Sequence, residues 1–139
     1  MPYPDLMVAP MREQLVQIGF TELRTPDQVD AFLDGEKRTL LLAVNSVCGC
    51  AAGMMRPGVY LSLQNARKTP EILTTVFAGQ DLEATERARA YITGYPPSSP
   101  SVALFKGGEL VYFMPRHEIE GRFPEDIAED LRAAYEEHC

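Results

Sequence analysis

The sequence predicts an α/β protein whose central mixed sheet has about four strands and is flanked by helices. Residues 39–44 end in an apolar run typical of a buried strand, and residues 71–77 are apolar and β-branched. The helix-length segment between these strands indicates a right-handed βαβ unit with parallel strands. Two further strands, residues 101–105 and 109–113, are joined at Lys106-Gly107-Gly108, which is a hairpin signal. One half of the sheet is therefore a βαβ unit and the other half a hairpin.

Two helices are expected before the sheet. Apolar residues recur at helical spacing ahead of a C-terminal cap at Gly19, in the order Val8, Met11, Leu15 and Ile18. Pro10 belongs in the first turn of this helix, where a missing N–H is tolerated. Thr25 is the expected N-cap of the second helix, with Gln28 completing a capping box, and that helix stops at Gly35.

The remaining helices follow the strands. The helix after the first strand is expected to be kinked or restarted at Pro57. Asp81 can cap a helix that runs to about Ile92, and the proline-rich segment 94–100 then leads to the hairpin. A last helix starts near Pro124 and has one apolar face, formed by Ile127, Leu131 and Tyr135. No internal repeat or linker is visible, so residues 1–139 are predicted to form a single domain.

Composition narrows the function classes. With 45% hydrophobic and 24% charged residues, the 139-residue chain has the make-up of an ordinary globular domain. A net charge of −7 argues against nucleic acid and anionic membranes as partners. No apolar run approaches the roughly 20 residues that a membrane span needs. The first residues lack the pattern of a signal peptide, so we expect a cytoplasmic protein. The oligomeric state stays open.

Two of the three cysteines, Cys48 and Cys50, lie where the first strand ends and a helix begins. Unpaired N–H groups and the helix dipole at such a position favour a thiolate, which predicts a thiol–disulfide reaction centre. Cys48 is the expected nucleophile because it comes first after the strand, nearest the exposed turn. Residues i and i+2 of a helix do not face each other, so Cys50 is poorly placed for an internal disulfide. Gly49 relieves part of this constraint through its wider backbone range.

The order of the elements, with cysteines after the first strand and a proline before the hairpin, resembles the thioredoxin-like fold. Residues 99–111 look like the thioredoxin stretch around its cis-proline. The closer resemblance is to the bacilliredoxin family, a thioredoxin-like group with a Cys-Gly-Cys centre, over segments 44–53, 76–81, 94–100 and 116–121. Unlike thioredoxin, the chain has no tryptophan, and Leu42 replaces the buried acidic residue, so Cys50 would lack a carboxylate proton shuttle.

The resemblance implies a thiol–disulfide oxidoreductase with no cofactor beyond its co-substrate bacillithiol, a low-molecular-weight thiol that it removes from S-thiolated client proteins. A disulfide-isomerase activity is implied as well. Cys48 is expected to attack the protein-side sulfur and carry the small thiol away, with Cys50 resolving or auxiliary. Pro100 is the implied cis-proline, which would leave the backbone of Ser99 free to pair with a client. The other expected substrate-binding residues are Asn45, Ser46, Gly49, Arg116 and His117.

Two other interpretations stay open. Cys-Gly-Cys also suits a non-enzymatic redox sensor or a metal-binding module, and the available zinc ligands are Cys48, Cys50, Cys139, His117 and His138. These residues lack the paired spacing of zinc motifs, so no metal site is predicted. Cys139, at the chain terminus, either resolves the intermediate or has no role.

Overall fold

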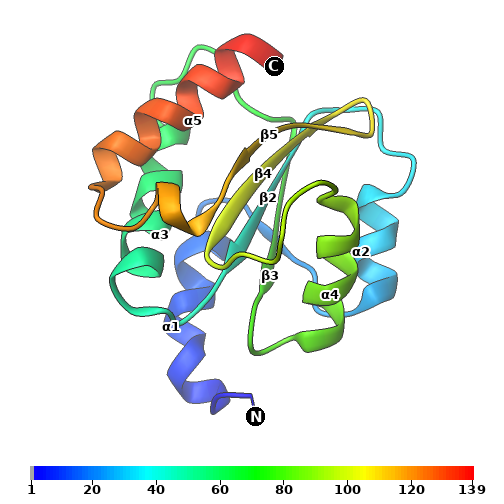
Figure 1. Ribbon diagram of the computed structural model, residues 1–139, viewed down its shortest axis with the longest axis vertical. Coiled ribbons are helices and arrows are strands. Elements are labelled where there is room, and N and C mark those ends of the chain that lie inside the picture. The colour runs from blue at the N-terminus through cyan, green and yellow to red at the C-terminus, as the bar shows by residue number, and fades with distance from the viewer. Residues whose placement is uncertain (1) are drawn as a thin grey trace.

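The computed structural model describes residues 2–139 as a five-stranded mixed sheet between two layers of helices (Figure 1). The strands are β1 Thr21–Glu22, β2 Leu40–Asn45, β3 Ile72–Phe77, β4 Ser101–Lys106 and β5 Glu109–Met114. The helices are α1 Asp5–Val16, α2 Pro26–Leu33, α3 Gly49–Leu63, α4 Leu82–Tyr91, α5 Pro124–His138 and the 3₁₀ turn η1 Arg116–Glu118. The strand order is β1-β3-β2-β4-β5.

The pairing follows the expected division of the sheet. β2 and β3 are parallel, whereas β2 with β4 and β4 with β5 are antiparallel. The short β1, which the sequence analysis missed, adds a parallel strand beside β3. Two residues are too few to show a period-2 pattern, so only the pairing with β3 makes β1 a strand.

Both faces of β2 are buried, which explains its uninterrupted apolar sequence. Leu41 and Ala43 pack into a core that α1, α3 and α5 cover. Leu42 and its neighbours on the same face pack into a second core under α2 and α4. The carboxyl end of β2, and with it the start of α3, is thereby fixed from both sides.

Two prolines lie inside helices, and both helices run on through them. Pro10 stands in the middle of α1 because that helix already begins at Asp5. Pro57 stands within α3, which continues to Leu63 without a break. Tertiary packing holds α3 together: a Cβ added at Gly58 would lie 2.8 Å from Cγ2 of Ile127 on α5. The close approach of these helices outweighs the one hydrogen bond that a proline removes.

The expected caps are formed in part. The Oγ1 of Thr25 accepts the N–H of Gln28, as predicted, but the Gln28 side chain accepts the N–H of Arg24 and not that of Thr25. Asp81 occupies the N-cap position of α4 without a capping hydrogen bond from its side chain. Its carboxylate instead binds an arginine of α1, as described below.

None of the helices in the described residues is both long and apolar enough to cross a membrane. The apolar face predicted for the last helix is confirmed, since Ile127, Leu131 and Tyr135 are all fully buried.

The buried Tyr135 leads to a prediction for alkaline pH. Burial raises its pKa, although a hydrogen bond with Ser62 opposes this in part. The unfolded chain therefore loses the phenol proton near pH 10 while the folded chain retains it, so stability falls as pH rises above about 10. We expect urea unfolding of Tyr135→Phe to show a shallower loss of stability over this range than the unmodified protein. Equal slopes would contradict the prediction.

Candidate functional site

The strand-to-helix junction is held by short backbone contacts. Cys48 occupies the N-cap position of α3, and its N–H donates to Oγ of Ser46 at 3.2 Å. The N–H of Gly49 donates to the carbonyl of Val47 at 2.6 Å. Gly49 has a φ of +38°, in the left-handed region that favours glycine, so a side chain here would strain the turn. The first turn of α3 leaves N–H groups without intrahelical acceptors beside both thiols.

The two thiols are free and differ in exposure. Cys48 is half-buried and Cys50 is exposed. Cys48, the expected nucleophile, adjoins the exposed turn at Gly49 but is the less exposed of the two thiols. The role of Cys48 as nucleophile stays a prediction that rests on its place at the end of the strand.

Arg116 connects the loop before β4 with Cys48. Its backbone N–H donates to Oγ of Ser98 at 2.7 Å, and its Nη1 donates to the carbonyl of Ser99 at 3.2 Å. The pKa of the Arg116 guanidinium is raised, first by its hydrogen bond to Glu120 and next by its interaction with Cys48. A cation thus lies close to the half-buried thiol of Cys48.

The Ser99–Pro100 peptide bond is cis, as the resemblance implied. The carbonyl of Ser99 accepts one hydrogen bond from the guanidinium of Arg116 and retains a second lone pair, so pairing of this backbone with a client stays a prediction. The adjoining turn η1 places Arg116 against this loop, in line with its place among the expected site residues.

His117 lies apart from these contacts. Its side chain is 81% exposed, and its nearest acidic neighbour is Glu118 at 4.0 Å. The structure thus gathers Cys48, Pro100 and Arg116 at one end of the sheet and directs His117 to solvent.

Arg56 supports the junction from below, and the sequence analysis overlooked it. It is buried, and its Nη1 donates to Oδ1 of Asn45 at 3.0 Å and to the carbonyl of Ser46 at 2.9 Å. Its Nε donates to Oε1 of Gln14 at 2.9 Å. All three acceptors are neutral, and burial lowers the pKa of the guanidinium. Asn45 and Ser46 are themselves buried, so they shape the turn from within and do not reach solvent.

A sequence signal for Arg56 did exist. It is the only charged residue in α3, and two of its neighbours at helical spacing, Ala52 and Val59, are buried. A lone arginine on the apolar face of a helix must find buried acceptors, and the end of the preceding strand supplies them.

Cys139 lies at the opposite end of the sheet. Burial raises the pKa of its thiol, while a hydrogen bond with Thr39 acts in the other direction. Thr39 precedes β2 and Cys48 follows it, so the two thiols are separated by the length of a six-residue strand, roughly 20 Å. Cys139 therefore cannot resolve an intermediate on Cys48 of the same molecule.

The possible zinc ligands do not come together either. Within residues 2–139 no three histidine, cysteine or acidic side chains are grouped so that they could hold a metal ion.

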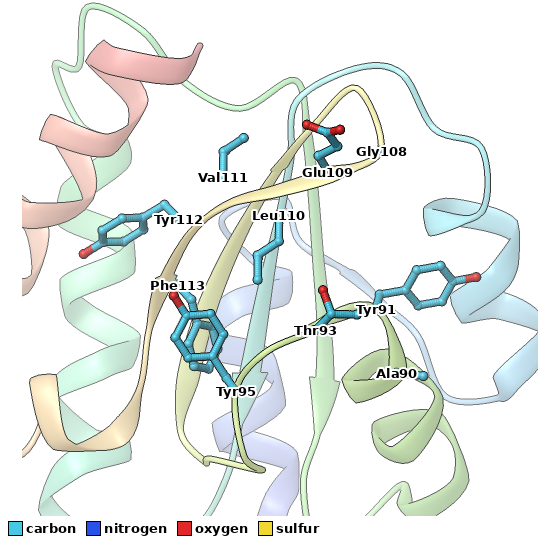
Figure 2. Close-up of a pocket in the computed structure, with 10 residues that line it drawn as sticks. All are labelled: Ala90, Tyr91, Thr93, Tyr95, Gly108, Glu109, Leu110, Val111, Tyr112 and Phe113. Atoms are coloured by element: carbon cyan, nitrogen blue, oxygen red, sulfur yellow. The ribbon is translucent and has the colours of Figure 1, made fainter.

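A cavity of about 560 Å³ lies away from the cysteines, between the end of α4 and the strand β5 (Figure 2). Its lining includes Tyr91 and Tyr95, from α4 and the loop that follows it, and Leu110 and Phe113, from β5. None of its lining residues belongs to the junction or to η1.

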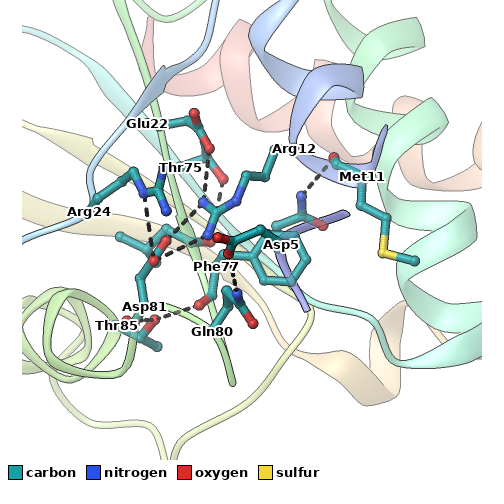
Figure 3. Close-up of polar contacts among 12 residues, drawn as sticks. Asp5, Met11, Arg12, Glu22, Arg24, Thr75, Phe77, Gln80, Asp81 and Thr85 are labelled. Atoms are coloured by element: carbon teal, nitrogen blue, oxygen red, sulfur yellow. Dashed lines mark hydrogen bonds and ion pairs between the residues drawn. The ribbon is translucent and has the colours of Figure 1, made fainter. Parts of the chain in front are cut away.

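A polar network joins α1 to the two strands at the β1 side of the sheet (Figure 3). Nη1 of Arg12 binds Glu22 at 2.9 Å, and the same guanidinium binds both carboxylate oxygens of Asp81. The guanidinium also lies 5.1 Å from the ring centre of Phe77. Burial alone would lower the pKa of Arg12, but its hydrogen bonds to Asp81 and Glu22 raise it overall. The network fixes α1, from which Gln14 reaches Arg56.

Changing Asp81 to Asn should lower the free energy of unfolding by about 1–3 kcal/mol, because it leaves a largely buried guanidinium with one carboxylate. Urea denaturation measures this loss. A matched control is Glu36→Gln, which breaks a more exposed contact with Arg38 and should have a much smaller effect. Similar losses in both variants would show that the network adds nothing beyond a surface ion pair.

The chain is similar to known proteins over almost its whole length. The model of a family described as disulphide isomerase matches residues 3–139. A bacilliredoxin of Salinibacter ruber is 56% identical over 140 residues, which cover 100% of this chain and 82% of the relative. A bacilliredoxin of Geobacillus kaustophilus is 50% identical over 142 residues, covering 100% of this chain and 98% of the relative.

Solved structures show the fold. A thioredoxin of Malassezia sympodialis superposes with a TM-score of 0.57 at 14% identity, covering 86% of this chain and 90% of that chain. Mitochondrial thioredoxin 3 of Saccharomyces cerevisiae gives a TM-score of 0.55 at 13% identity, covering 86% and 98%. The thioredoxin-like fold expected from the order of elements is confirmed.

Proposed function

This chain belongs to the bacilliredoxin family, and from that premise we propose that it removes bacillithiol, or a similar small thiol, from mixed disulfides on client proteins. Its relatives and its fold support a thiol–disulfide oxidoreductase in general. The observation that carries the finer proposal is the half-buried Cys48 thiol, which faces Arg116 at the start of α3.

The first step is an exchange at sulfur. The Cys48 thiolate attacks the sulfur of the small thiol, forming a bond between Cys48 and the small thiol while the bond to the client breaks. The electron pair leaves on the client's sulfur, which takes a proton from water. Attack on the protein-side sulfur, as first expected, would release the small thiol and leave the client on Cys48. Only attack on the small thiol's sulfur lets Cys48 carry that thiol away.

The second step regenerates Cys48. A second small thiol can attack the adduct and leave as a symmetrical disulfide, or Cys50 can attack Cys48 and form an internal disulfide. The exposed Cys50 is two residues away, across a left-handed Gly49, so its thiol is open to solvent. This favours release by an external small thiol over closure of a bridge between residues i and i+2.

Mass spectrometry tests the proposal. A Cys50→Ala variant mixed with a bacillithiolated client should gain one bacillithiol on Cys48 while the client loses it. An adduct on no cysteine would overturn the proposal and favour a non-enzymatic redox sensor.

The choice of small thiol is tested by rates. Clients carrying bacillithiol, glutathione or cysteine in the same mixed disulfide should be de-thiolated fastest when the thiol is bacillithiol. Equal rates would show that the site selects the disulfide and not the thiol.

Disulfide isomerisation is a second candidate, favoured by the description of the matching family model and by the two free thiols. Here the Cys48 thiolate would attack a client disulfide and be displaced by another client thiol. Recovery of activity from a scrambled disulfide protein measures it, and no gain over a small-thiol buffer would exclude it. We place either reaction in the reducing cytoplasm, where free thiols are maintained.

A further inference from the structure

A second cavity, of about 250 Å³, continues the one beside β5. The two share Ala90, Tyr95 and Phe113, so they form one groove along the end of α4 and the strand β5. We call this the β5 groove. The ring of Tyr95 packs against that of Phe113 in its wall (Figure 2), with ring centres 4.6 Å apart and planes tilted by 42°, and Tyr95 is 49% exposed.

One wall of the groove is the edge of the sheet. β5 is the last strand in the sheet order and pairs only with β4. Leu110 packs with the α2 and α4 side of the sheet, whereas Val111 and Tyr112 pack with the α3 and α5 side, and all three line the cavity. The groove therefore follows the exposed edge of β5, where backbone groups can pair with another extended chain.

The groove also holds a cation without a partner. Nε of Arg89 is buried and has no hydrogen-bond partner among residues 2–139. Arg89 lines the second cavity, and burial lowers the pKa of its guanidinium. A buried donor of this kind costs free energy until an acceptor reaches it, and an anionic acceptor is the strongest.

One end of the groove reaches the cysteine site. Ser98 lines the second cavity, and its Oγ accepts the backbone N–H of Arg116, the residue that faces Cys48. A segment bound along β5 would thus lead towards the half-buried thiol.

We propose that the β5 groove docks an extended segment of the client protein, paired with the edge of β5 and carrying an acidic residue that binds Arg89. The proposal rests on the proposed function, since it names how the client of that reaction is held. The occupant is a client and not a small thiol alone, because the groove runs the length of an edge strand before it reaches the site.

Binding is tested without chemistry, in a variant with both Cys48 and Cys50 changed to Ser. The probe is a capped, cysteine-free peptide of alternating valine and threonine with one central glutamate, and its partner peptide has glutamine there. Calorimetric titration should show the glutamate peptide binding about fivefold more tightly, since a charge-assisted hydrogen bond exceeds a neutral one. Arg89→Gln should remove this difference. Arg87→Gln, the same change on another face of α4, should keep it.

No binding, or a preference that survives Arg89→Gln, would overturn the docking proposal whatever the outcome for the reaction. Sedimentation of the free chain examines a second copy as the occupant. A dimer that Arg89→Gln dissociates would also overturn the proposal.

Kinetics provide the second readout. Arg89→Gln and Tyr95→Ala should raise KM for a bacillithiolated protein about fivefold, given that each removes one contact at the surface of the groove. Both should leave KM unchanged for the mixed disulfide of bacillithiol with free cysteine, which has no chain to dock. Equal effects on both substrates would contradict docking, whereas inactivity of the unmodified protein towards both would contradict the proposed function instead.

Discussion

Replacing Cys48 with serine is expected to lower small-thiol transfer by more than about a thousandfold, because a serine hydroxyl is not ionised at neutral pH and cannot exchange with a disulfide. The contacts that shape the turn should persist. The bond to Oγ of Ser46 comes from the backbone N–H of Cys48, and the next bond comes from the N–H of Gly49. The loss should therefore appear in the rate and not in the melting temperature.

The measurement is release of bacillithiol from a modified client, followed beside thermal unfolding. Cys139→Ser is the matched control, since it removes a thiol at the far end of β2 and should leave transfer unchanged. Because Cys50 is more exposed than Cys48, one result would contradict the assignment of Cys48 as nucleophile. If Cys48→Ser retains transfer and Cys50→Ser loses it, Cys50 is the nucleophile.

The sequence reveals those parts of the fold that depend on local pattern and misses those that depend on contacts between distant segments. The apolar run of β2 and the hairpin glycines are local signals, and both led to the right elements. Pro10 misled about the start of its helix, and no restart occurs at Pro57, because packing stabilises both helices in a way that a local rule does not include. The short β1 depends entirely on a neighbour that lies far along the chain.

The site shows the same division. The position of Cys48 at a strand-to-helix junction followed from local pattern. The hydrogen bond from Arg116 to the carbonyl of Ser99 did not, because it joins residues 17 positions apart. Asp81 looked like a helix cap, yet its carboxylate binds Arg12, a partner 69 positions away. In both cases a charged side chain, Arg116 or Asp81, binds a partner that lies far along the chain. Local pattern does not reveal such a partner.

Long-range contacts matter most at Arg56. Changing Arg56 to methionine should slow small-thiol transfer by about tenfold to a hundredfold. One guanidinium nitrogen holds both Oδ1 of Asn45 and the carbonyl of Ser46, and Ser46 in turn accepts the N–H of Cys48. Without the guanidinium these acceptors lose their shared donor, and the turn that presents the thiol is free to shift. Methionine fills much of the same space, so the fold should survive.

Stability and reactivity must be measured together, because two terms oppose each other in the variant. The carbonyl of Ser46 loses its donor, which destabilises the fold by about 1–3 kcal/mol, whereas Oδ1 of Asn45 still accepts the N–H of Ser46. Removal of a buried cation without a carboxylate partner offsets part of that loss. We therefore expect a modest change in urea unfolding and a large change in transfer rate. Arg132→Met is the matched control, since Arg132 also donates to a neutral acceptor on α3, the carbonyl of Leu61, at the end far from the thiols.

A rescue experiment separates positioning from general destabilisation. Arg56→Lys retains the charge, but an ammonium cannot reproduce the planar fork that spans three acceptors, so it should restore the rate only in part. Low concentrations of guanidinium added to Arg56→Ala should raise its transfer rate, because the free ion can occupy the vacated space and bind Asn45 and Ser46. In Arg132→Met the same additive should have no effect. If guanidinium leaves the rate of Arg56→Ala unchanged while Arg56→Met loses stability and activity in parallel, Arg56 is a structural residue of the core and does not position Cys48.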